Sequence, residues 1–348
     1  MITRPIARAD RTVTVIGLGT RGLSGALRGI EPEDVARVVP AAIEAGCTLV
    51  DVSPAWGESL KVTGEALRAL RAQDRVCVAC AVPAAESFGS VRRVQPVSYV
   101  QKTVEAALRA MKAEALPLAW LGGWRDAWLD DGDWPELVGT MMRLVREGKV
   151  LAWGVSAPDG APGEALRAVA EPWIAAVSAR CSLFDRAALD ELVPAAAKAE
   201  VAVIAREPLA RGALGGELAP TVRFPPEDER LGWSEARLAS IVPDLARLAR
   251  AVRHTPPAAS STEDGRALLD GMKRKDDVTC ATVAELALRY LIDSPGITAA
   301  VVGARTIPHA FEALMAGDGS TVSVRIRDVL VHRQWGERWY DEAVARQR

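Results

Sequence analysis

The sequence predicts an α/β protein built as a single (β/α)8 TIM barrel with an N-terminal β-hairpin and a C-terminal helix. Two observations lead to this prediction. Short apolar runs alternate with amphipathic segments along the 348 residues, which is typical of strands alternating with helices around a parallel sheet. Eight such runs can be counted, mostly with short connections, and eight is the number that closes a barrel. We therefore expect one barrel domain over residues 1–348.

The expected elements follow in order after a short hairpin that begins at Arg4. Strands are expected at residues 13–19, 48–52, 76–82, 117–121, 150–156, 174–179, 201–206 and 299–303. Helices are expected at residues 33–45, 58–71, 97–114, 134–147, 162–170, 189–200, 241–252, 283–292, 308–315 and 324–344. The first helix shows the signals used: Val35, Val39 and Ile43 recur at helical spacing, and Gly46 follows as a C-cap.

Two stretches after the seventh expected strand break the alternation. Residues 207–240 are rich in Gly and Pro, and residues 254–279 are polar and charged. We expect both to be long loops over or beside the barrel face. The second is either a solvated loop without function or a lid.

Composition narrows the class of protein. The chain is 49% hydrophobic and 25% charged with a net charge of −2, which is typical of a globular protein that binds neither nucleic acid nor a membrane surface. No apolar run is long enough to span a membrane, and the start of the chain lacks the apolar core of a signal peptide. We expect a cytoplasmic protein with a small-molecule substrate. High usage of Ala, Arg and Val indicates a GC-rich bacterial genome, and the oligomeric state is left open.

The five cysteines predict buried, reduced thiols. Cys77 and Cys80 have metal-site or redox spacing, but they lie inside one apolar run and would project to opposite faces of a strand. We therefore expect no metal site.

An acid ends the second expected strand. Asp51 is followed by a turn that contains Trp56 and Gly57. Barrel enzymes carry their catalytic groups at the C-terminal ends of the strands, so Asp51 is a catalytic candidate, and the alternative is that it caps the turn. Residues 17–22 match the GxGxxG dinucleotide pattern. No clear helix opens after them and no acidic strand end follows, so a Rossmann site is disfavoured.

Segments over nearly the whole chain resemble the aldo-keto reductase family. They are GLGT at residues 17–20, AIEAG at 42–46, VD at 50–51, GEAL at 64–67, EGKV at 147–150, GVS at 154–156, LFDR at 183–186, PLARG at 208–212 and GART at 303–306. The resemblance implies a TIM barrel with its pocket at the C-terminal ends of the strands. It also implies NADP(H) as the cofactor, extended across that face.

The resemblance implies a catalytic Asp, Tyr, Lys and His, of which only the Asp is kept, as Asp51. The Tyr position is Trp56, the Lys position is Ala81 and the His position is Gly123. An indole N–H donates a hydrogen bond but does not titrate usefully. Ordinary carbonyl reduction is therefore not expected.

The family's nicotinamide contacts are changed, whereas its phosphate contacts are better kept. The Ser-Asn pair that holds the carboxamide is Ser156-Ala157, and the aromatic residue that stacks on the ring falls on Arg206. Gly303 and Arg305 lie at a strand-to-helix turn, where N–H groups and a guanidinium can hold phosphate. The positions expected to contact NADP(H) are Ser156, Leu209, Gly303, Arg305 and Thr306.

Three functions remain open for the pocket. One is non-redox acid–base chemistry (dehydration, isomerisation or cyclisation) on a bulky carbonyl or polyketide-like molecule of secondary metabolism. The others are an NADP(H)-dependent oxidoreductase of altered mechanism and a non-catalytic ligand-binding barrel. Asp51 and Glu207 are the expected acid–base groups. The expected substrate contacts are Trp56, Trp124, Arg180 and Arg206.

Overall fold

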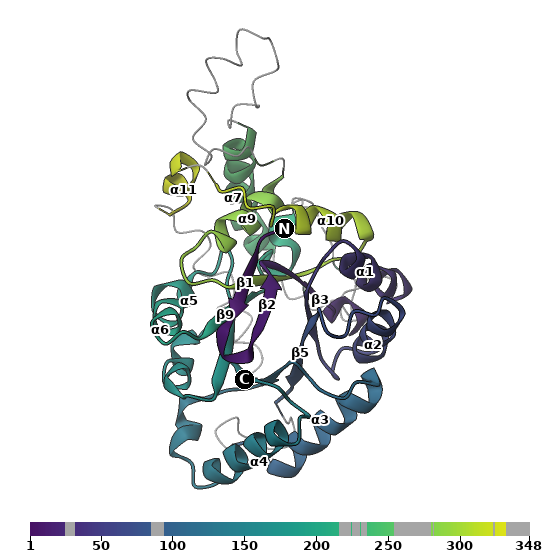
Figure 1. Cartoon of the computed structure of the whole chain (residues 1–348). Helices are drawn as coiled ribbons and strands as arrows, with labels where there is room; N and C mark the ends of the chain where they lie inside the picture. Colours follow the sequence, from purple (N-terminus) through teal and green to yellow (C-terminus); the bar gives the residue numbers. More distant parts are fainter. Residues whose placement is uncertain are drawn as a thin grey trace, which may run out of the picture.

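The computed structural model describes residues 1–24, 32–84, 94–215, 224, 230, 235–253, 280, 282–322 and 324–331. Its centre is a closed barrel of eight strands in the order β10-β3-β4-β5-β6-β7-β8-β9 (Figure 1). They are β3 (Ile16–Gly19), β4 (Leu49–Val52), β5 (Cys77–Val82), β6 (Leu118–Leu121), β7 (Trp153–Ser156), β8 (Ile174–Arg180), β9 (Ala202–Arg206) and β10 (Ala299–Gly303). The circle closes where β10 pairs in parallel with β3, with Gly303 opposite Gly19. The predicted TIM barrel is confirmed.

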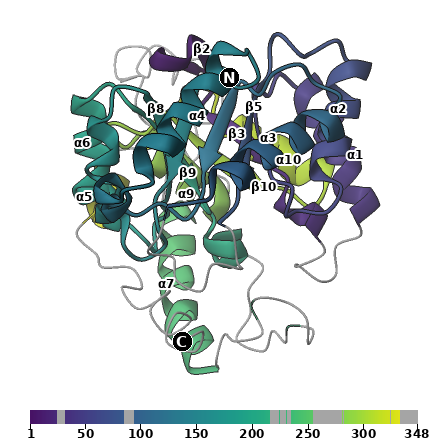
Figure 2. The same cartoon turned by 90° about the horizontal axis from the view of Figure 1, so that it is seen from below.

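Helices surround the barrel (Figure 2). They are α1 (Pro32–Glu44), α2 (Ser59–Ala69), α3 (Val97–Met111), α4 (Trp134–Arg146), α5 (Ala187–Asp190), α6 (Leu192–Lys198), α7 (Glu235–Arg253), α9 (Val283–Ile292), α10 (Ile307–Met315) and α11 (Val324–Val331). None of the helices in the described ranges is long and apolar enough to cross a membrane.

Two predicted helices differ in form from the structure. The helix expected at residues 162–170 is two 3-10 turns, η5 (Pro162–Ala165) and η6 (Ala168–Ala170). The end at Ala170 agrees with the expected range, and Pro172 explains it, because a residue before proline avoids the helical region and Glu171 is extended at ψ 128°. The helix expected at 189–200 is divided into α5 and α6 at Glu191, whose φ is −126°.

The strand expected at residues 13–19 belongs to two sheets. Thr14 ends β2 (Arg11–Thr14), which pairs antiparallel with β1 (Thr3–Ile6). The barrel strand begins only at Ile16, opposite Ala300. The chain therefore changes partner at Val15, although the run of strand-forming residues continues through this position.

The β1–β2 hairpin closes the N-terminal end of the barrel, and α7 lies toward the opposite end (Figure 2). Ile6 and Val13 pack in the same cluster as Leu49, which begins β4. Arg8, between the two strands, donates to the carbonyl oxygens of Ile174 and Ala199 at 2.9 and 2.6 Å. The predicted N-terminal hairpin is confirmed, and it leaves the C-terminal strand ends as the open face.

Side chains along each strand point alternately into the barrel and outward toward the helices. They form an inner and an outer hydrophobic cluster. Within β5, Cys77 belongs to the inner cluster and Cys80 to the outer cluster under the helices. Both thiols are free and buried, and burial raises the pKa of each to about 12. The expectation that this pair points to opposite faces is confirmed.

The long connections are only partly described. Residues 207–240 are not one continuous loop, because they contain the 3-10 segment η7 (Ala210–Gly215) and the start of α7. Residues 254–279 and 332–348, which include the expected lid and the end of the expected last helix, lie outside the described residues.

Candidate active site

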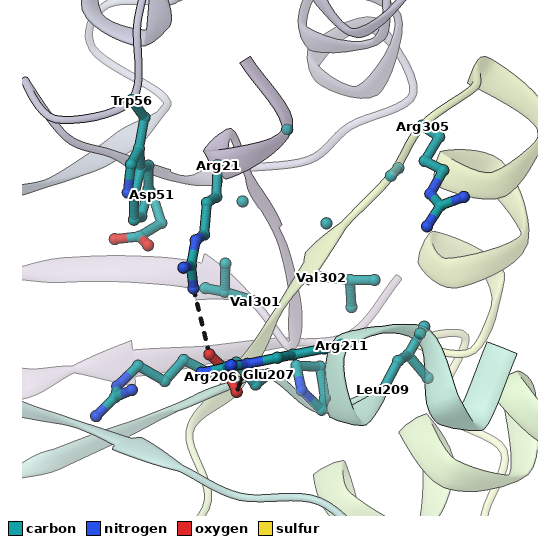
Figure 3. Close-up of a pocket in the computed structure, with 16 residues that line it drawn as sticks. Arg21, Asp51, Trp56, Arg206, Glu207, Leu209, Arg211, Val301, Val302 and Arg305 are labelled. Atoms are coloured by element: carbon teal, nitrogen blue, oxygen red, sulfur yellow. Dashed lines mark hydrogen bonds and ion pairs between the residues drawn. The ribbon is translucent and has the colours of Figure 1, made fainter. Parts of the chain in front are cut away.

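A cavity of about 260 Å³ opens at the C-terminal ends of the barrel strands (Figure 3). Its walls come from the segment after β3, the end of β4, the segment after β9 and the end of β10. The lining residues are Gly19, Arg21, Gly22, Asp51, Trp56, Arg206, Glu207, Pro208, Leu209, Arg211, Gly212, Val301, Val302, Gly303, Ala304 and Arg305. Four arginines and two acids therefore converge on one small cavity.

Asp51 lies at one end of this cavity with its carboxylate inside the barrel mouth. The indole Nε1 of Trp120 on β6 donates a hydrogen bond to Asp51 Oδ1 at 3.1 Å. Burial raises the pKa of Asp51 to about 7, against the hydrogen bond from Trp120 and the charge of Arg206, which both lower it. A carboxyl group with this pKa exchanges its proton near neutral pH, as a general acid or base must.

Trp120 fills the barrel interior below Asp51. Its side chain is 2% exposed and belongs to the inner cluster. The ring fits because Gly154 on β7 has no side chain: a Cβ there would lie 2.7 Å from Trp120 Cε3 and 2.6 Å from the carbonyl oxygen of Ala176. Trp120 and Asp51 are 69 residues apart, so no local pattern in the sequence links them. The one signal present was the alternation of β6, which turns Leu118 and Trp120 inward together.

Arg206 ends β9 and reaches across to the segment after β7. One terminal nitrogen lies 2.5 Å from Asp159 Oδ1, and the other donates to the carbonyl oxygen of Ala157 at 2.6 Å. Its Nε is buried and has no hydrogen-bond partner among the described residues. Burial alone would raise the pKa of Asp159, but Arg206 and Arg180 outweigh it and hold that pKa below its usual value.

Arg180 does not reach the cavity, so its predicted substrate contact is corrected. Its side chain is 5% exposed, and Nε donates to Asp185 at 2.6 Å. A terminal nitrogen lies 3.5 Å from Asp159. Arg180 therefore shares the carboxylate of Asp159 with Arg206.

Glu207 lines the cavity between two guanidinium groups (Figure 3). Oε1 lies 3.4 Å from Arg21 and Oε2 lies 3.2 Å from Arg211 Nε. The backbone of Glu207 is left-handed, with φ at 55°. Both oxygens of the carboxylate are thus engaged by cations, an arrangement that suits charge neutralisation better than the proton transfer predicted for Glu207.

The two predicted aromatic contacts separate in the structure. Trp56 lines the cavity and lies in a tight turn, where Gly57 has φ at 53° and comes too close to the Leu23 carbonyl to carry a side chain. Trp124 is fully buried outside the barrel and packs edge-on against Trp128 and Trp134 with ring centroids 5.7 and 5.4 Å away. The prediction that Trp124 contacts substrate is corrected, because this cluster belongs to the packing of α4 and η4 (Asp126–Asp130).

The predicted phosphate contacts lie at the other end of the cavity. Leu209, Gly303 and Arg305 line it, and the side chain of Arg305 points toward it in Figure 3. Thr306 caps α10, where its hydroxyl accepts from the His309 N–H at 3.4 Å. Ser156 ends β7 half-buried and does not line this cavity.

The residues present fit only part of the dinucleotide that the family resemblance implies. At the β10 end, a Cβ added to Gly303 would meet nothing within 4 Å, so the backbone there is open to a ligand beside Arg305. At the β9 end, Arg206 occupies the position of the aromatic residue that the resemblance implies for stacking on the nicotinamide ring. Its guanidinium instead reaches across to Asp159 and Ala157. The phosphate part of NADP(H) fits, and the nicotinamide ring loses its support.

A closed (β/α)8 barrel with titratable groups in a cavity at the C-terminal strand ends is the architecture of barrel enzymes. The chain belongs to the Aldo/keto reductase family, whose family profile matches residues 15–320. It is 25% identical over 311 residues to the aldo-keto reductase YhdN of Bacillus subtilis, covering 88% of this chain and 86% of that protein.

Solved structures share the fold. The glycerol dehydrogenase AKR11B4 from Gluconobacter oxydans matches 99% of this chain and 95% of its own, with a TM-score of 0.68 and 21% identity. An aldo-keto reductase from Klebsiella pneumoniae, solved in complex with NADPH, matches 96% of this chain and 98% of its own, with a TM-score of 0.64 and 23% identity.

Proposed function

We propose that the chain is an enzyme that uses Asp51 for acid–base chemistry on a small carbonyl compound, without hydride transfer. The observation that carries the proposal is the position of the Asp51 carboxylate in the cavity, hydrogen-bonded by Trp120 at 3.1 Å, with a pKa of about 7. Near neutral pH both the acid and the base form are populated, so one group can remove a proton and return it.

The reaction that suits this group is the movement of a proton next to a carbonyl. Asp51 in its carboxylate form takes the proton from the carbon beside the carbonyl. The electron pair of that C–H bond forms a C=C bond to the carbonyl carbon, and the π pair of the C=O bond moves to the oxygen. Arg206 lines the same cavity and its positive charge acts on Asp51 there, so this charge can stabilise the developing oxyanion. Protonated Asp51 then returns the proton to a different atom, which completes an isomerisation or expels a leaving group.

The cavity favours a small, anionic substrate over the bulky molecule predicted from sequence. Its volume of about 260 Å³ lies below the range of about 300–1,000 Å³ typical of drug-sized ligands. Arg21, Arg206, Arg211 and Arg305 line it against Asp51 and Glu207. We therefore expect a substrate with a carboxylate or phosphate beside its carbonyl group.

A second candidate is NADP(H)-dependent reduction with Asp51 as the proton donor. It is favoured by the open turn at Gly303 and Arg305 in the same cavity and by the NADPH complex of the Klebsiella pneumoniae relative. One feature argues against it. Arg206 stands at the position where the family resemblance implies an aromatic residue under the nicotinamide ring, and its guanidinium pairs with Asp159.

The two candidates are separated by following the substrate proton. Pyruvate and dihydroxyacetone phosphate, as carboxylate and phosphate probes, are incubated with the enzyme in deuterium oxide, and NMR measures exchange at the carbon beside the carbonyl. We expect exchange without NADPH, rising with pH up to about 7 and lost by about 100-fold in Asp51→Asn. Exchange that survives in Asp51→Asn contradicts the role of Asp51. If the wild type shows no exchange but consumes NADPH, reduction is supported instead. If the wild type shows neither exchange nor NADPH consumption, the non-catalytic barrel is supported.

A further inference from the structure

The arrangement around Glu207 resembles a bound anion more than a free catalytic acid. Its two carboxylate oxygens lie 3.4 Å from Arg21 and 3.2 Å from Arg211. Its side chain is only 15% exposed and lies on the cavity wall (Figure 3). Two guanidinium groups that converge on one carboxylate form the arrangement that proteins use to bind a carboxylate or phosphate of a ligand.

The two arginines come from separate parts of the barrel face. Arg21 begins η2 (Arg21–Ser24) after β3, whereas Arg211 lies in η7 after β9. β10 stands between these strands in the barrel, and its end, at Val302 and Gly303, forms the cavity wall between them. The carboxylate of Glu207 therefore bridges the cavity at the place where a ligand anion would bridge it.

The backbone holds Glu207 in this place in spite of an unfavourable conformation. Glu207, Ala210 and Arg211 all have left-handed φ values, of 55°, 48° and 56°. A side chain with a Cβ is sterically disfavoured there, and Asn tolerates the conformation better than most residues. The segment is thus shaped to turn one carboxylate toward Arg21, and it is not a relaxed loop that happens to lie near it.

We propose that Glu207 is an internal counter-anion that sets the specificity of the cavity. It competes with anionic ligands for Arg21 and Arg211, and a ligand carboxylate or phosphate binds between them only by displacing the Glu207 side chain. The inference rests on the anion-binding end of the proposed function and is independent of the chemistry at Asp51.

The test is a direct binding measurement. Inorganic pyrophosphate and NADPH are titrated by calorimetry into the wild-type chain, Glu207→Gln and Glu207→Asn at low ionic strength. We expect both variants to bind pyrophosphate about ten-fold more tightly than the wild type, because the competing charge is gone. Unchanged or weaker binding in both variants overturns the proposal. Asn suits the left-handed backbone, so it guards against a folding defect in the Gln variant.

Two matched controls separate local competition from the change in net charge. Glu58→Gln removes one charge from an exposed carboxylate that pairs with Lys61 and does not line the cavity. It is expected to leave pyrophosphate affinity unchanged. Adding Arg211→Met to Glu207→Gln is expected to abolish the gain. A gain that persists without Arg211, or that also appears in Glu58→Gln, contradicts the proposed competition. None of these outcomes depends on turnover, so the acid–base proposal stands or falls separately.

Discussion

Replacing Asp51 by Asn tests the raised pKa of this carboxyl group through protein stability, independently of any substrate. Asn keeps the shape of Asp and an oxygen to accept the Trp120 hydrogen bond. The folded protein raises the pKa of Asp51 from 3.8 to about 7, mainly through burial. In the unfolded chain the group therefore loses its proton at lower pH than in the folded chain.

The sign and size of the effect follow from this shift. Below the unfolded pKa, Asp51 is neutral in both states and carries no penalty. As pH rises toward the folded pKa, the unfolded state is increasingly favoured, and above about 7 the penalty levels off. A shift from 3.8 to about 7 corresponds to about 4 kcal/mol at most, at about 1.4 kcal/mol per pKa unit. Between about pH 5 and about pH 8 the stabilising effect of Asp51→Asn should grow by about 3 kcal/mol.

The measurement is the free energy of unfolding from urea titrations of both proteins across this pH range. Only the difference between the two proteins matters, because all other titrating groups are shared. Asp34→Asn provides a control, since Asp34 is an exposed carboxylate on α1. Two stability curves that stay parallel for Asp51→Asn would refute the raised pKa, and with it the physical basis for proton transfer by Asp51 near neutral pH.

Two further predictions concern packing and charge. Gly154→Ala should destabilise the fold by about 1–3 kcal/mol, because its Cβ would overlap the ring of Trp120. Gly139→Ala, in α4 with nothing within 4 Å, should instead stabilise by up to about 1 kcal/mol, and equal thermal shifts for the two variants would contradict the packing argument. Arg180→Met should cost about 3–5 kcal/mol in chemical denaturation, because it leaves Asp185 without its 2.6 Å partner. Adding Asp185→Asn should recover part of that loss, and strictly additive losses would show that the pair is not coupled.

Much of the fold could be predicted because alternation in the sequence reports directly on strands and helices. The boundaries of β10 and α9 agree with the expected ranges 299–303 and 283–292. The errors arise where local chemistry interrupts the pattern. The run of strand-forming residues continues through Val15, although the chain passes from the hairpin to the barrel there. The helix expected at residues 189–200 is divided at Glu191, whose φ of −126° is not helical.

The site was harder to predict, since its contacts join strands that are distant in sequence. Asp51 and Trp120 are 69 residues apart and belong to β4 and β6, which are not neighbours in the barrel. Trp124 follows a Gly-Gly turn, where no alternation indicates which side of the barrel its ring takes. The structure places it in the outer packing with 0% exposure.

The sequence by itself determined the barrel, its open face and the acid at the end of β4, because strand alternation and strand ends are local properties of the chain. Only the tertiary structure decided which groups meet on that face. Barrel closure brings Trp120 under Asp51, Asp159 to Arg206, and Arg21 to Glu207. The physical reason is that burial and charge at a site depend on distances across the barrel, and the closed circle of strands sets those distances.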